Sequence, residues 1–113
     1  MNYDLEERAA KFGEDIIKFV KTLPYNDFNK PLVSQIIRSA TSIGANYMEA
    51  NQASSKKDFK NKIRISQKEA NETKHWLRMI GVANSNKEVE CKKLLQEAHE
   101  LTLIFAKISR SCE

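Results

Sequence analysis

Carboxylates and histidines three residues apart raise the question of a metal site. Glu72 and His75 have the Glu-x-x-His spacing that di-iron and di-manganese sites use on the helices of a bundle. The corresponding pair further along the chain is Gln96 and His99, which has an amide where a carboxylate ligand is required. On a helical wheel, Glu72 and His75 also point more than about 100° away from the apolar side of their helix. We therefore expect no metal and no cofactor.

Nucleophilic side chains are present, but they lack partners. Cys91 and Cys112 lie about six turns apart on one expected helix, too far to form a disulfide, and are predicted to be buried small hydrophobes. Ser39, Thr41 and Ser42 have no acid or base near them in the sequence. Glycine-rich phosphate loops and nucleophile elbows are missing from the sequence. We expect no catalytic residues and a protein that is not an enzyme.

Basic residues are concentrated in one short segment. Residues 56–68 carry six cations against Asp58 alone, a net charge of +5, whereas the rest of the chain carries 13 basic and 14 acidic residues. On a helical wheel, five of the six cations point away from the core, and Lys62 borders the core side. These five, called the basic stripe below, are Lys56, Lys57, Lys60, Arg64 and Lys68.

Such a stripe is suited to a polyanion, because cations that bind phosphates release condensed counterions. The simpler interpretation is a solvated helix face that only keeps the protein in solution. No element that would read bases is evident, so the sequence predicts no direct sequence readout.

Four apolar stripes with the period of amphipathic helices must position these residues. The most regular is Phe59, Ile63, Ser66, Ala70, Thr73, Leu77 and Ile80. The predicted helices span about residues 4–23, 30–51, 56–81 and 87–111. Because the connections are short, consecutive helices should be antiparallel neighbours. We therefore expect an all-α fold, an antiparallel up-down-up-down four-helix bundle, with residues 1–113 as a single domain.

The ends of these helices have candidate capping residues. These are Asp4, Asn29, Ser55 and either Ser85 or Asn86, and Pro24 should end the first helix. Several apolar residues lie beside or off the apolar stripes. They are Tyr47, Met48, Ile65, Trp76 and Ile104. Such extra apolar surface on a small bundle suggests that subunits associate.

The overall composition limits the function classes. The chain has 113 residues, a net charge of +4 and 41% hydrophobic residues, enough for a core. No run approaches the roughly 18 apolar residues of a membrane span, and the first residues lack the apolar region of a secretory signal. We expect a cytoplasmic protein with no membrane partner.

Two stretches carry a family resemblance. SIGANYMEANQASSKKDF at residues 42–59, preceded by QIIRSAT at 35–41, and KEANETKHWL at 68–77 resemble the signature of the four-helix-bundle family of 23S rRNA intervening-sequence proteins. The pattern maps onto Gln35, Arg38, Ser39, Ser42, Asn46, Glu49, Lys68, Glu69, Glu72 and Trp76. The chain departs from it with Ala50 where Gly is common and with Tyr47-Met48 where Ile-Ala is usual. The polar members of the pattern could form contacts between helices or could contact a ligand.

The resemblance implies an antiparallel bundle that is frequently a ring-shaped homopentamer. It also implies possible partners, because the family includes the basic accessory protein of diversity-generating retroelements, which associates with nucleic acid and with a reverse transcriptase.

Our hypothesis from the sequence is a non-enzymatic, oligomeric accessory protein that binds nucleic acid, RNA in particular, although RNA and DNA both remain open. Lys56, Lys57, Lys60, Arg64 and Lys68 would contact phosphates, and Arg38 could add to the basic surface. The alternative is a protein-interaction or assembly module with no nucleic-acid role.

Overall fold

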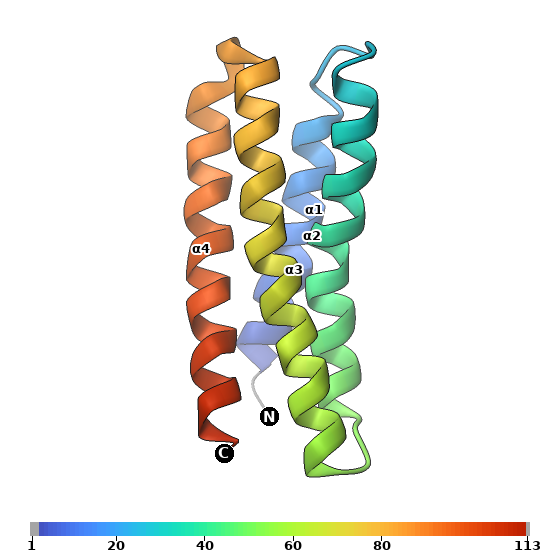
Figure 1. Cartoon of the computed structure of the whole chain (residues 1–113), viewed down its shortest axis with the longest axis vertical. Coiled ribbons are helices and arrows are strands. Elements are labelled where there is room, and N and C mark those ends of the chain that lie inside the picture. The colour runs from blue at the N-terminus through green and yellow to red at the C-terminus, as the bar shows by residue number, and fades with distance from the viewer. Residues whose placement is uncertain (1–2, 113) are drawn as a thin grey trace.

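The computed structural model describes residues 3–112. This part of the chain folds into four long helices that run alternately up and down (Figure 1). They are α1 (Tyr3–Val20), α2 (Asn29–Asn51), α3 (Lys56–Ala83) and α4 (Glu88–Ser111), with a short 3₁₀ turn at Ser85–Lys87 before α4. The bundle measures 44 × 20 × 19 Å. The predicted all-α up-down-up-down fold is confirmed.

The four helices pack in chain order around one core. Each helix contacts its neighbours in the chain, and α1 also packs on α4. As a result, α1 and α3 lie diagonally opposite, and α3 is flanked by α2 on one side and α4 on the other. One face of α3 therefore remains directed outward along its whole length.

The core consists of the apolar stripes that the sequence predicted. Ile63, Ala70 and Ile80 of α3 are fully buried, as are Ile36 of α2 and Phe105 of α4. Tyr47, which the sequence also placed beside the stripes, is part of this core. It is only 3% exposed and meets Phe105 edge to face, with 5.5 Å between the ring centroids. Met48 is 46% exposed, and the other three off-stripe residues are half-buried.

The first connection differs from the prediction at both ends. α1 ends at Val20 rather than near Leu23, and the Thr22 hydroxyl donates to the Phe19 carbonyl oxygen at 2.6 Å. Leu23 precedes a proline and is disfavoured in a helical conformation, so the chain leaves the helix in a turn before it.

The prediction of Asn29 as a cap is wrong. The side chain of Asn26 accepts from the backbone N–H groups of Phe28 and Asn29, at 3.1 and 2.8 Å. Asn29 instead lies buried in the first turn of α2, where its amide exchanges two hydrogen bonds with the amide of Asn84. The two amides tie the start of α2 to the end of α3.

The other caps give a mixed result. Ser55 caps α3 as predicted, because its hydroxyl oxygen accepts from the backbone N–H of Asp58 at 3.0 Å. Asp4, by contrast, lies inside the first turn of α1. Neither Ser85 nor Asn86 caps α4, because both belong to the 3₁₀ turn, and Lys87 at the cap position makes no side-chain cap bond.

The two cysteines also differ. Cys91 is buried, as predicted, and burial raises the pKa of its thiol. Cys112 is exposed, which corrects the prediction of a buried residue. It follows Ser111, the last residue of α4, so the core no longer covers it, and its thiol donates to the Ile108 carbonyl oxygen at 3.2 Å.

Candidate functional site

The basic stripe lies on the outward face of α3. Lys56, Lys57, Arg64 and Lys68 are exposed, and Lys60 is half-buried in the same row. From Lys56 to Lys68 the stripe extends about 18 Å at 1.5 Å per residue. Within residues 3–112, the four exposed members form no salt bridge. The ammonium group of Lys68 lies near enough to Glu72 to help lower the pKa of that carboxyl, but it forms no ion pair with it.

The first two members of the stripe occupy an unfavourable place for a cation. Lys56 and Lys57 are the first residues of α3, whose N-terminus carries the positive end of the helix dipole. Asp58 is the acidic residue of that first turn. Cations at this end cost stability, about 0.3–1 kcal/mol each at an exposed position. Helix stability therefore does not explain why lysines stand there.

Lys62, the remaining cation of the segment, is turned to the side. Its ammonium group donates to Glu49 of α2 at 2.8 Å, and this contact raises the pKa of Lys62. The wheel placed Lys62 at the border of the core, and it is half-buried there. It joins α2 to α3 and does not belong to the outward row.

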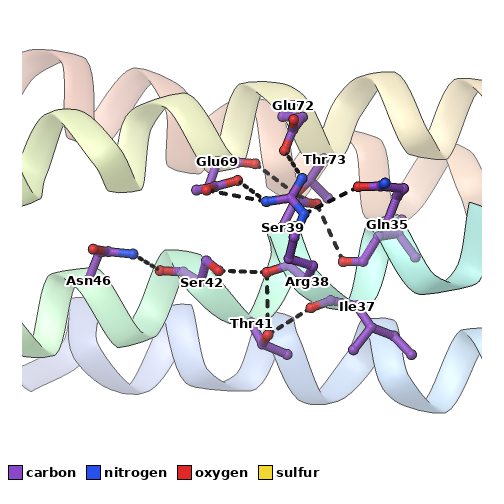
Figure 2. A network of polar contacts seen from close by, with 11 residues as sticks. Gln35, Ile37, Arg38, Ser39, Thr41, Ser42, Asn46, Glu69, Glu72 and Thr73 are labelled. Carbon is purple, nitrogen blue, oxygen red and sulfur yellow. Dashed lines mark hydrogen bonds and ion pairs between the residues drawn. The ribbon is translucent and has the colours of Figure 1, made fainter.

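Arg38 forms the centre of a second polar group, between α2 and α3 (Figure 2). Its guanidinium donates to Glu69 at 3.1 Å and to Glu72, while Nε donates to Gln35 at 3.2 Å. The bond to Glu72 contributes most to the raised pKa of Arg38, and the same bond lowers the pKa of Glu72. Two carboxylates thus compensate one cation, and Arg38 points to α3 rather than joining the basic stripe.

The other polar residues of the family pattern also bond within the bundle. The Ser39 hydroxyl meets the Thr73 hydroxyl at 2.8 Å in the buried interface of α2 and α3. Ser42 donates to the Arg38 carbonyl oxygen, and Asn46 donates to that of Ser42. The Ser39 bond joins α2 to α3 and favours the interpretation of the pattern as contacts between helices, whereas the Ser42 and Asn46 bonds stay within α2.

The sequence analysis missed one member of the outward face. Arg78 is exposed and lies 18 residues, about five turns, after Lys60, so the two are in line along α3. The spacing of Arg78 from Lys60 could have been noticed in the sequence, but Arg78 lies outside the segment in which the lysines are dense. With Arg78 included, the outward face carries cations over about 33 Å. Two of the three carboxylates of α3, Glu69 and Glu72, bond Arg38 of α2, and the third is Asp58 in the first turn.

The residues with metal-binding spacing are not brought together. Glu72 is bonded to Arg38, and His99 on α4 contacts the ammonium group of Lys74 at 3.2 Å. His75 is exposed beside Trp76. Over residues 3–112 there is no group of three His, Cys, Asp or Glu side chains placed to hold a metal ion.

None of the helices among the described residues combines the length and the apolar character needed to cross a membrane.

On the side away from the stripe, Arg8 of α1 forms ion pairs with Glu97 and Glu100 of α4, at 2.7 and 2.9 Å. This pairing raises the pKa of Arg8 and joins the first helix to the last.

Comparison with known proteins gives a family match and a structural match. Residues 1–107 match the family model described as "23S rRNA-intervening sequence protein". The fold is similar to the crystal structure, at 1.70 Å resolution, of a protein with unknown function from the S23 ribosomal protein family of Bacteroides thetaiotaomicron VPI-5482. The two chains share 32% identity with a TM-score of 0.81, over 93% of this chain and 97% of the other. No curated protein matches the sequence.

Proposed function

Because this chain belongs to the 23S rRNA-intervening sequence protein family, we propose that it is a non-enzymatic, oligomeric accessory protein that binds nucleic acid through the basic stripe. The observation that carries the proposal is the set of exposed cations on α3, Lys56, Lys57, Arg64 and Lys68, which have no ion-pair partner within residues 3–112. Lys60 completes the row. Arg38, which the sequence analysis added to this surface, contributes to the structure of the bundle instead.

The charge distribution supports a phosphate backbone as the ligand. Each phosphate that a cation neutralises releases counterions and contributes about −0.9 to the slope of log affinity against log salt. Five contacts per chain therefore predict a slope of about −4.5. An oligomer of identical chains, such as the pentamer that the family resemblance implies, would repeat the stripe and increase the avidity for a long polyanion.

A charge reversal tests the proposal. In Lys57→Glu/Arg64→Glu, two exposed outward cations become anions, and the new Glu at position 57 suits the helix dipole, so the bundle should remain folded. We expect its affinity for RNA or DNA to fall by more than about tenfold, by fluorescence anisotropy at low salt, because two phosphate contacts become repulsive.

The matched control makes the same change in charge elsewhere. Lys18→Glu/Lys93→Glu alters two exposed lysines beside the shallow groove between α1 and α4, away from the outward face of α3. It should bind like the wild type. Equal affinities of the two variants, or no binding by the wild type at about 100 mM salt, would reject the basic stripe as the site.

A second candidate function rests on a different observation. At the opposite end of α3, a groove of about 700 Å³ is lined by Phe28, Leu32, Met79 and Val82. Phe28 and Val82 are 76% and 80% exposed. Such an apolar groove favours an assembly module that contacts a protein, a reverse transcriptase among the possible partners. That function predicts a protein partner that remains bound after nuclease treatment and is lost in Val82→Asp.

A further inference from the structure

The outward face of α3 has a composition that distinguishes between classes of nucleic acid. Proteins that bind single strands combine a basic groove with aromatic side chains on which the bases stack. Between Lys56 and Arg78 this face offers cations together with the exposed amides of Asn61 and Asn71. Two strongly exposed aromatic side chains, Tyr25 and Phe28, lie instead in the connection between α1 and α2.

The aromatic residues of α3 itself offer few open ring faces for stacking. Phe59 is half-buried against the core. Trp76 is also half-buried and its indole N–H is covered. His75 is exposed, but its ring packs edge to face on Trp76, with 5.0 Å between the centroids. A single strand on this face would have to be ordered with little of the stacking that normally compensates for the loss of its freedom.

The position of α3 in the bundle also limits how it can bind. Both of its sides are covered, by α2 and by α4, so only a ridge of the helix is accessible (Figure 1). With α2 and α4 on either side, α3 cannot enter the major groove of a duplex as an isolated recognition helix does. Its lysines and arginines therefore reach phosphates rather than base edges. Phosphate contacts fix the position of a duplex but carry no sequence information.

The dimensions fit a duplex. The ridge carries cations over about 33 Å, close to one helical turn of B-form DNA at about 34–36 Å. A duplex presents about one negative charge per 1.7 Å of its axis, a denser and more rigid array than one strand offers. The cations of α3 are fixed on a rigid helix, so a rigid ligand loses less conformational freedom on binding.

We infer that the outward face of α3 binds double-stranded nucleic acid through its phosphates, in preference to single strands and without reading sequence. The inference rests on the proposed function, because it names the ligand class of the same basic stripe. The phosphate ladder is common to RNA and DNA duplexes.

The experiment compares four probes on the full-length protein by fluorescence anisotropy. They are an RNA duplex and a DNA duplex of about 20 base pairs, roughly two helical turns, a DNA duplex of shuffled sequence and one unpaired strand of the same length. We expect both kinds of duplex to bind at least about tenfold more tightly than the single strand, and the shuffled duplex to bind within about twofold of the original. A difference between the RNA and DNA arms would show which helix form the ridge prefers.

Two variants assign the binding to this face. Lys57→Glu/Arg64→Glu should weaken duplex binding, whereas His75→Ala, which removes the exposed ring, should leave binding to every probe unchanged. A single strand that binds as tightly as the duplexes, or a loss of single-strand binding in His75→Ala, would overturn the duplex inference while leaving the proposed function intact. Absence of binding to all four probes would reject both.

Discussion

Cations on two neighbouring faces of α3 have opposite environments. On the face toward α2, Lys62 is bonded to Glu49, and Arg38 of α2 is bonded to Glu69 and Glu72. On the outward face, Lys57 and Arg64 form no salt bridge within the described part of the chain. The paired cations connect two helices and belong to the fold. Among residues 3–112, Lys57 and Arg64 join no other helix by an ion pair, and Lys57, at the start of α3, opposes the helix dipole.

The role of a cation on these helices therefore depends on the partner of its charge and not on the type of residue. Removing a paired cation should cost stability and leave affinity for nucleic acid unchanged. Removing an outward cation should lower the affinity for nucleic acid and leave the stability nearly unchanged. The free energy of unfolding and the affinity for nucleic acid distinguish the two kinds of cation.

The largest effect on stability is expected for Arg38→Ala. Glu69 is only 9% exposed, and without the guanidinium its carboxylate stays buried without its charged partner. We expect a loss of about 1–2 kcal/mol in urea denaturation, less than for a fully buried pair because the Arg38 side chain is 46% exposed.

The matched variant is Arg64→Ala, an arginine on the same helix pair that points outward. Its stability should change by less than about 0.5 kcal/mol, as is usual for a surface substitution. Equal losses in the two variants would remove the distinction between the two faces.

Substitution of the two lysines at the start of α3 should raise the stability instead of lowering it. Lys56→Glu/Lys57→Glu places anions in the first turn of α3, where the helix dipole favours them. We expect the free energy of unfolding to rise by about 0.5–1 kcal/mol in urea at low salt, while affinity for duplexes falls. A variant that is both more stable and a better binder would refute our interpretation of these lysines.

A smaller effect is expected from pH. The bond to Arg38 lowers the pKa of Glu72 in the folded protein below its ordinary value of 4.5. A lowered folded pKa adds stability above the unfolded pKa, and this stability is lost as the pH falls through the folded value.

Between about pH 5 and pH 3, wild type should therefore lose more stability than Glu72→Gln, by roughly half a kcal/mol after allowance for solvent screening. Urea denaturation at the two pH values measures the difference. Parallel losses in both proteins would show that Glu72 is not held by Arg38 in solution.

The sequence predicted the parts of the fold that depend on local spacing. The buried positions Ile63, Ala70 and Leu77 follow from the period of one helix, and the Ser55 cap follows from a serine three residues before Asp58. The predicted bundle followed from four such stripes and their short connections.

Side-chain contacts between different helices could not be predicted from local spacing. The bonds of Arg38 to Glu69 and Glu72 join residues 31 and 34 positions apart, and they require the register of α2 against α3. The Asn26 turn replaced the expected Asn29 cap because both asparagines suit a helix start, and only the burial of Asn29 against Asn84 decides between them. In the candidate site, the direction of the basic stripe followed from the wheel, whereas the separation of Arg38 from it did not.

The salt dependence of duplex binding, measured for wild type and for Lys57→Glu/Arg64→Glu, tests whether the outward cations of α3 bind phosphates. We predict a slope of log affinity against log salt of about −4.5 for each bound chain of wild type, and a slope shallower by about 1.8 for each bound chain of the variant, because two phosphate contacts are lost. Parallel lines for the two proteins, or an affinity that does not change with salt, would contradict the account, since the outward cations of α3 would then not be the groups that meet the phosphates.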